Sequence, residues 1–258
     1  MLDIVAAFFL LFSNAVVIIP FLILGFIWLD KSLFYHAICL ILISSLINVA
    51  LKVSFQIPLP ASIAKNWFAF PSGHMQMTTV LYGWIAYKIG IEWIKRVLIT
   101  LLIGIALSLI HFNYHNVYDI IGALFFALLI LVLYPILYSK WPTAMPWILL
   151  ITAINLIAYI HLRYRPIPNH AWVAFFMLVG FIIAETLSKG RHILLSIKQK
   201  LIATLLVIVL MILTYSVFQI PAVHTLPFYF AYMEWLIIGF ILPWSCLIAK
   251  WIKPSSVF

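Results

Sequence analysis

The chain has 258 residues, of which 67% are hydrophobic and only 8% are charged. This composition excludes a soluble globular domain and is typical of an integral membrane protein. The formal net charge of +9 would suggest a nucleic-acid partner in a soluble protein. In a membrane protein it mainly reports how the chain is oriented, so we expect no nucleic-acid partner.

Long apolar runs predict an all-α, polytopic transmembrane helix bundle of about nine spans. Runs of roughly 18 or more apolar residues are long enough to cross the hydrocarbon core of a bilayer as helices. The first run has neither a basic start nor a small-residue cleavage site, so we expect a retained span and no signal peptide. In chain order the predicted spans cover roughly residues 4–29, 33–52, 73–91, 96–112, 116–138, 145–162, 170–188, 199–219 and 227–249.

The basic residues predict the orientation of these spans. An odd number of spans puts the two termini on opposite sides of the membrane. We expect the N-terminus outside and the C-terminus in the cytoplasm, because most of the 15 Lys and Arg residues are then cytoplasmic, as the positive-inside rule requires. The cytoplasmic ends would carry Lys31, Lys88, Lys95, Arg96, Lys140, Lys189, Arg191, Lys198, Lys200, Lys250 and Lys253, and the outer ends only Lys52, Lys65, Arg163 and Arg165.

Two polar clusters interrupt this apolar chain, and both belong to the predicted outer side. The first is Ser72-Gly73-His74, at the start of the third span, and the second contains His115 and Asp119, at the start of the fifth. Ionisable groups at membrane depth cost several kcal/mol unless they are partnered, so they favour a functional interpretation. The two clusters predict one active site at a membrane surface.

The spacing of His115 and Asp119 is typical of an activated histidine. Residues four apart share one face of a helix, so the two side chains can meet. A carboxylate bonded to one ring nitrogen leaves the other nitrogen free to attack. We therefore interpret His115 as a nucleophile that Asp119 orients, with His74 as the general acid.

A phosphate-binding role is predicted for the residues around His74. Unpaired backbone N–H groups at the start of a helix suit an anion, and Gly73 allows a close approach of the backbone. Lys52, at the end of the second span, adds a positive charge. Ser72, Gly73 and Lys52 are the predicted phosphate ligands of a phosphoryl-transfer site.

These motifs resemble those of the type 2 phosphatidic acid phosphatase superfamily, which are integral-membrane lipid phosphatases and related acid phosphatases. Phe70-Pro71-Ser72-Gly73-His74 matches one family motif, and His115-x-x-x-Asp119 matches another. The order and spacing agree over roughly residues 45–138. The resemblance implies a phosphohistidine at His115, an orienting Asp119, a proton-donating His74, and neither a metal nor another cofactor.

The sequence departs from the family at two arginines. In the family a lysine is followed after six residues by Arg-Pro, whereas Lys52 is followed by Leu59-Pro60; a second arginine is replaced by Leu109. Leucine cannot replace the bidentate grip of arginine on phosphate. Arg163 and Arg165 are the candidate replacements; the alternative is a pair of interfacial anchors.

We expect a membrane lipid phosphatase that hydrolyses a lipid phosphate or pyrophosphate at the outer face. One alternative is a phosphotransferase that passes phosphate or a phospho-headgroup to another lipid or glycan. The two histidines and the aspartate also resemble those of sphingolipid synthases, which move a phospho-headgroup between lipids. Another is a lipid-binding or translocating protein without catalysis. A zinc site formed by His111, His115 and Asp119 is a further alternative, but it leaves Ser72-Gly73-His74 unexplained.

The chain is expected to divide into a lipid-phosphatase-like core of five spans, residues 1–140, and an appended four-span bundle, residues 141–258. Because the chain is short and has no recognisable targeting element, we expect it in a bacterial inner membrane, with the active site facing the periplasm.

Overall fold

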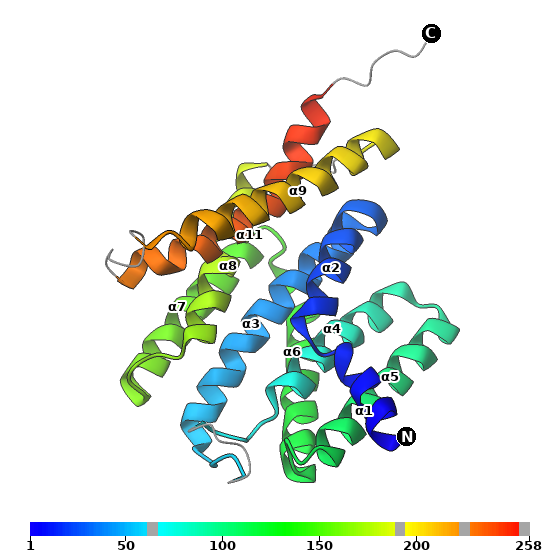
Figure 1. The fold of residues 1–258 in the computed structure, drawn as a ribbon, viewed down its shortest axis with the longest axis vertical. Coiled ribbons are helices and arrows are strands. Elements are labelled where there is room, and N and C mark those ends of the chain that lie inside the picture. The colour runs from blue at the N-terminus through cyan, green and yellow to red at the C-terminus, as the bar shows by residue number, and fades with distance from the viewer. Residues whose placement is uncertain (61–66, 189–193, 222–227, 253–258) are drawn as a thin grey trace.

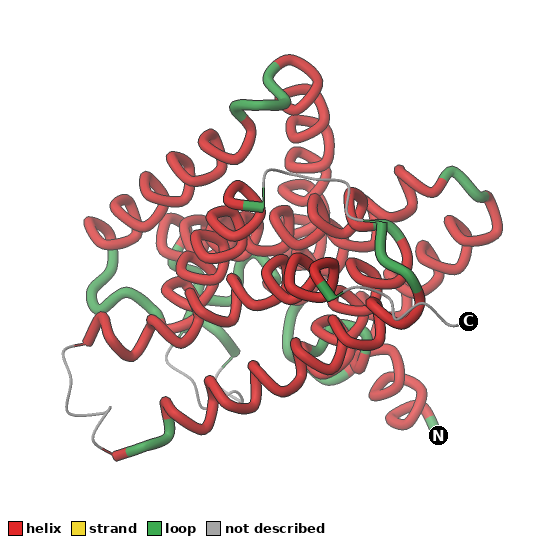
Figure 2. The backbone as a smooth tube through the Cα atoms, turned by 90° about the horizontal axis from the view of Figure 1, so that it is seen from above, coloured by secondary structure: helices red, strands yellow, loops and turns green. Residues whose placement is uncertain are grey.

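The predicted all-α fold is confirmed. The computed structural model describes residues 1–60, 67–188, 194–221 and 228–252, and in these ranges the chain is helical without any strand (Figure 2). The one pairing of extended backbone in the described ranges is an isolated antiparallel bridge between Pro58 and Phe68. Four of the basic residues that predict the orientation lie outside the described residues, namely Lys65, Lys189, Arg191 and Lys253.

The described helices follow the predicted spans closely, except that the predicted first span, 4–29, is broken after Leu11 and divided among three helical segments. Because helix ends fray and their boundaries shift by a residue or two, the small differences in length carry no weight. In chain order the helices are α1 (Leu2–Leu11), α2 (Ala15–Leu24), the π-helical turn η1 (Gly25–Leu29), α3 (Lys31–Phe55), α4 (Gly73–Ile89), α5 (Glu92–His111), α6 (Val117–Lys140), α7 (Met145–Arg163), α8 (Asn169–Leu187), α9 (Ile197–Phe218) and α11 (Phe228–Trp251) (Figure 1).

Apolar helices identify an integral membrane protein. Among the described residues, seven helices are long and apolar enough to cross a membrane: α3, α5, α6, α7, α8, α9 and α11. The pair formed by α1 and α2–η1 is bent by 41° and makes an eighth candidate when it is counted as one span. Helix α4 has 17 residues, which is at the lower limit for crossing a bilayer. The total of nine spans and their orientation stay predictions.

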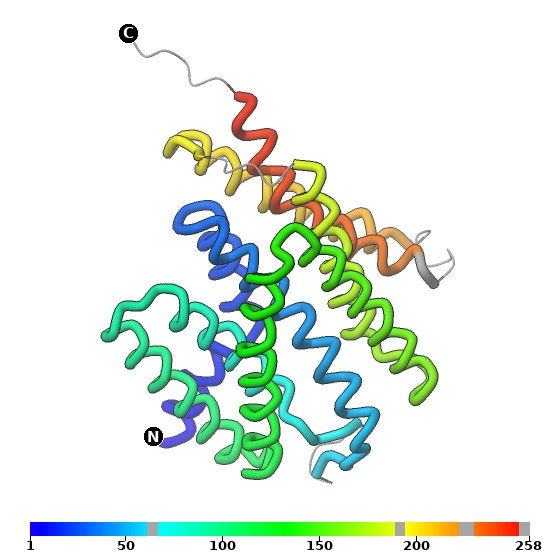
Figure 3. The backbone as a smooth tube through the Cα atoms, turned by 180° about the vertical axis from the view of Figure 1, so that it is seen from behind, coloured from blue at the N-terminus to red at the C-terminus, as the bar shows by residue number. Residues whose placement is uncertain are grey.

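Helix α3 is the centre of the molecule. In its most apolar window 67% of the residues are buried inside the protein, a larger share than in the other candidate spans of the described chain. It packs against α4 on one side and against α7 and α8 on the other, while α5 and α6 lie against α4 (Figures 1 and 3). Both predicted halves of the chain therefore pack against the same helix.

The C-terminal helices are joined by a close crossing of α8 and α11. A Cβ added at Gly180 would lie 2.0 Å from the backbone oxygen of Leu236, and one added at Gly239 would lie 2.3 Å from that of Met177. Small residues at such crossings let helix backbones approach each other in a membrane, where lipid provides no hydrophobic drive for association. These two glycines fix the position of α8 relative to α11.

Candidate active site

Three connecting segments meet at one end of the bundle. They are the segment between α3 and α4, the turn between α5 and α6, and the turn between α7 and α8. The backbone N–H of Ser72 donates to the carbonyl of Asp119 at 3.1 Å. The ring of Trp67 packs edge-on against that of Tyr164, with centroids 5.3 Å apart. The segments that the sequence predicted to share one side of the membrane thus lie together.

The start of α6 positions His115 and Asp119. The side chain of Asn116 accepts from the backbone N–H of Asp119 at 2.9 Å, and the carboxylate of Asp119 accepts from the N–H of Asn116 at 3.1 Å, which forms a capping box. The same carboxylate oxygen lies 3.2 Å from Nδ1 of His115. Because Asp119 is only 2% exposed and its carboxylate can only accept, Nδ1 donates the proton of this bond. In the neutral imidazole the lone pair is then on Nε2.

The start of α4 positions His74. Ser72 caps this helix by accepting from the N–H of Met75 and is fully buried. A Cβ added at Gly73 would lie 3.1 Å from Oδ1 of Asn48, so glycine allows α3 and the start of α4 to approach closely. Gly73 and His74 line a cavity. The hydroxyl of Ser72 is used in the cap, and its predicted role as a phosphate ligand stays a prediction.

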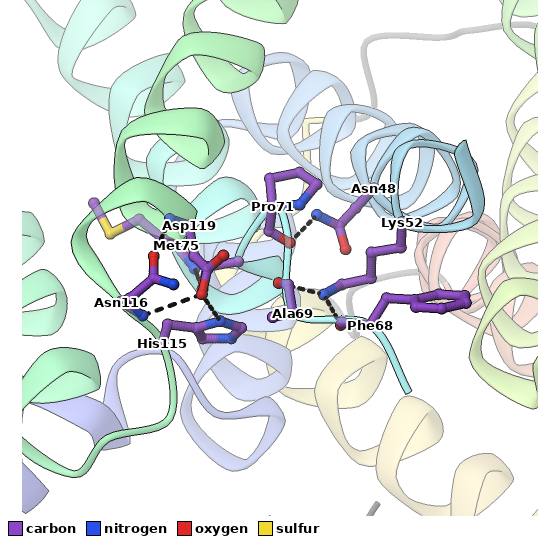
Figure 4. Close-up of polar contacts among 10 residues, drawn as sticks. Asn48, Lys52, Phe68, Ala69, Pro71, Met75, His115, Asn116 and Asp119 are labelled. Carbon is purple, nitrogen blue, oxygen red and sulfur yellow. Dashed lines mark hydrogen bonds and ion pairs between the residues drawn. The ribbon is translucent and has the colours of Figure 1, made fainter. Parts of the chain in front are cut away.

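Lys52 holds the segment that leads into α4. Its ammonium donates to the carbonyls of Phe68 at 2.6 Å and Ala69 at 2.8 Å, and the residue is only 6% exposed. Figure 4 shows this segment passing between Lys52 on α3 and the pair of His115 and Asp119. Since an ammonium has three donors, two serve the loop and one is left for a ligand.

The predicted catalytic histidines and Lys52 share one cavity of about 470 Å³. A volume of this size is in the range of ligand pockets, which run from about 300 to 1,000 Å³. Its wall combines basic, polar and aromatic side chains. The lining residues are Ser45, Asn48, Lys52, Leu59, Trp67, Phe68, Gly73, His74, Met77, Tyr114, His115 and His170.

The structure does not bring the two candidate arginines into this wall. Arg163 ends α7 and Arg165 follows it; both are exposed, and Nε of Arg165 donates to the carbonyl of His161 at 3.2 Å. Their role in phosphate binding stays a prediction. Of the two leucines that replace family arginines, Leu59 lines the cavity, whereas Leu109 is 1% exposed and belongs to the core.

Sequence reasoning did not place two of the polar residues in the cavity wall, Asn48 and His170. Asn48 donates to the carbonyl of Pro71 at 3.2 Å and to Oε1 of Gln76 at 2.9 Å, and so connects α3 with the start of α4. Asn48 lies four residues before Lys52, so the sequence alone indicates that the two side chains share one face of α3. His170 comes from α8, and no local motif marks it.

The histidines do not form a metal site in the described chain. In the alternative zinc site of His111, His115 and Asp119, the first residue is engaged elsewhere: Nε2 of His111 lies 2.7 Å from the carboxylate of Asp3 on α1. Among the described residues no group of three or more His, Cys, Asp or Glu side chains is arranged to hold a metal ion.

Comparison with known proteins agrees with the geometry. The family model of the PAP2 superfamily matches residues 33–143, from the start of α3 to just beyond α6. Over this segment the chain is similar to the PAP2 superfamily. This match supports a phosphatase or phosphotransferase type of chemistry on phosphate esters. The PAP2 segment contains Lys52, His74, His115 and Asp119, whereas His170 lies beyond it. Neither the curated proteins nor the solved structures gave a match.

Proposed function

We propose that this protein is a membrane lipid phosphatase that hydrolyses a lipid phosphate or pyrophosphate at the outer membrane face. The observation that carries the proposal is the bond of 3.2 Å between Nδ1 of His115 and Asp119, made where His115, His74 and Lys52 line one cavity. An imidazole held in this tautomer has its nucleophilic nitrogen available, and a second histidine and a cation lie in the same space.

In the proposed reaction, Nε2 of His115 attacks phosphorus and forms a P–N bond. The bond between phosphorus and the lipid oxygen breaks, and His74 donates the proton that this oxygen takes up. Water then attacks phosphorus and forms a P–O bond while the P–N bond to His115 breaks; His74 accepts the proton of the water, and inorganic phosphate leaves. Asp119 keeps His115 oriented and stabilises the positive charge on its ring. Lys52 and the backbone at Gly73 bind phosphate oxygens.

Leu59 in the cavity wall favours a second candidate function. A wall with fewer fixed cations than the family motif supplies suits a phosphate group of lower charge, such as a phosphodiester headgroup. In that case the phosphate or headgroup on His115 would pass to another lipid or glycan instead of water. A lipid-binding or translocating protein without catalysis is the remaining alternative, and it requires that His115 be dispensable.

We further propose that residues 1–140 form the catalytic core and that residues 141–258 form an appended bundle. The location proposed for the protein is a bacterial inner membrane, with the cavity opening to the periplasm. Accessibility labelling of single cysteines placed in the α5–α6 turn of intact cells would test this orientation, and labelling only after the cells are permeabilised would contradict it.

The function is tested with purified protein in mixed micelles that contain a phosphatidic acid or an isoprenyl pyrophosphate. We expect wild-type protein to release inorganic phosphate and His115→Asn to lose about 10³-fold or more of this rate. His161→Asn is the matched control, since His161 is exposed at the end of α7 and does not line the cavity.

The same assay separates the alternatives. Release that does not depend on His115 contradicts the mechanism. Release that appears only when an acceptor lipid is added, with the phosphate or headgroup found on that acceptor, identifies a transferase. If neither reaction occurs with any lipid tested, the result supports a lipid-binding or translocating protein without catalysis.

A further inference from the structure

We propose that His170, on α8, is a phosphate-binding residue of this site, so that the appended C-terminal helices complete a site which the PAP2 segment leaves short of cations. This inference rests on the proposed function and adds a ligand to it. His170 lies 27 residues beyond the end of the family match at residue 143. It nevertheless lines the same cavity as Lys52, His74 and His115.

Tertiary contacts fix the position of His170. It is the second residue of α8, and its ring packs edge-on against Trp67, with centroids 5.6 Å apart and an interplanar angle of 84°. The preceding residue, Asn169, accepts a hydrogen bond of 2.8 Å from the hydroxyl of Tyr232 on α11. The start of α8 is therefore held from both sides, by the loop before α4 and by α11.

The need for another ligand follows from the cavity wall. Leu59 lines the wall at a position where the resembling family has an arginine, and leucine offers phosphate no hydrogen bond. Two of the three donors of Lys52 are bonded to loop carbonyls. An imidazole donates one N–H when neutral and two when protonated, so His170 provides a donor in either state.

The competing explanation is that His170 only packs against Trp67. Its side chain is exposed and lines the cavity, whereas a purely structural ring at this position would need no nitrogen. Phenylalanine preserves an aromatic edge contact and removes both nitrogens, so His170→Phe separates packing from hydrogen bonding. Arginine restores a strong donor to phosphate, so His170→Arg tests rescue.

The experiment measures the binding of inorganic phosphate to the full-length protein in detergent, through the shift of the melting temperature with phosphate concentration. Wild type, His170→Phe, His170→Arg and the control His161→Phe are compared. We expect His170→Phe to bind phosphate about 10- to 100-fold more weakly, because a hydrogen bond to a charged group is lost. We expect His170→Arg and His161→Phe to stay within about threefold of wild type.

Lipid turnover gives an independent readout on the same proteins. We expect His170→Phe to raise KM more than it lowers kcat, because the nucleophile and the acid remain in place. If His170→Phe has no melting transition without phosphate, His170→Ala and His170→Gln take its place, and glutamine is expected to retain part of the binding through its amide N–H.

Equal phosphate binding by wild type and His170→Phe would overturn the inference, as would a wild type that does not bind phosphate or a failure of His170→Arg to restore binding. The proposed function can fail separately. If wild-type protein releases no phosphate from lipids but binds inorganic phosphate through His170, the result contradicts the proposed lipid phosphatase activity and supports His170 as a phosphate ligand.

Discussion

At the scale of single residues, the site depends on polar groups that each make hydrogen bonds stabilising the fold and also have a proposed chemical role. The carboxylate of Asp119 closes the capping box of α6 and holds His115. The ammonium of Lys52 bonds two loop carbonyls and also lines the cavity. Because burial of an unpaired charge is costly, these bonds are what allow such groups to lie within an apolar protein.

Asp119→Asn is expected to separate these roles. The amide oxygen can still accept from the N–H of Asn116, so the cap is largely retained, but an amide does not stabilise a positively charged His115. We expect kcat to fall about 10³-fold, with a melting temperature close to wild type. Phosphate release and thermal unfolding of the same preparation measure the two effects. A large loss of stability with unchanged kcat would show that Asp119 serves only the cap.

At the scale of helices, the close crossing of α8 and α11 determines where the start of α8 lies. A methyl group at Gly180 would overlap the backbone of Leu236, which cannot move aside without shifting α11. At Gly83 on α4 an added methyl would meet only the end of the Leu131 side chain at 2.6 Å, and a side-chain end can rotate away. The two glycines are therefore a matched pair for substitution.

We expect Gly180→Ala to destabilise the protein by about 1–3 kcal/mol, the usual cost of overpacking, and Gly83→Ala to cost less. If α8 supplies a phosphate ligand, Gly180→Ala should also weaken phosphate binding, because displacing α8 moves His170. Thermal unfolding with and without phosphate measures both quantities. Equal effects of the two substitutions would contradict the role given to the α8–α11 crossing.

At the scale of the whole molecule, the two predicted halves are also joined at the end opposite the cavity. Lys31 at the start of α3 pairs with Glu185 near the end of α8 at 2.8 Å, and both side chains are mostly buried, with 18% and 13% exposed. Lys95 and Glu92 pair at 2.6 Å within α5, and the Glu92 side chain is 69% exposed. The exposed, local pair of Lys95 and Glu92 is therefore a control for the mostly buried, long-range pair of Lys31 and Glu185.

Glu185→Gln is expected to lower the free energy of unfolding by about 1–3 kcal/mol, because it removes one charge of an ion pair whose side chains are mostly buried. Glu92→Gln should change it by less than about 1 kcal/mol, since exposed pairs contribute little. Denaturation in detergent checks the difference, and phosphate affinity should be the same in both variants. A Glu185→Gln protein as stable as Glu92→Gln would contradict a structural role for this pair.

Much of the fold was predictable from the sequence because membrane helices are specified locally. A helix satisfies its own backbone hydrogen bonds, so a long apolar run is sufficient to predict one. The described helices accordingly correspond to the predicted runs, and the spacing of His115 and Asp119 predicted their contact through the geometry of one helix turn. The spacing of Asn48 and Lys52 likewise places both on one face of α3, where both line the cavity.

By itself, the sequence determined the all-α membrane fold, the PAP2 motifs and the pairing of His115 with Asp119, because each depends on residues close together in the chain. Only the tertiary structure decided which distant residues share the cavity. It places Leu59 and His170 in the wall and leaves Arg163 and Arg165 exposed outside it. Charge and topology predict only the side of the membrane on which these residues lie. They carry no information on distance, which the packing of α7 and α8 against α3 sets.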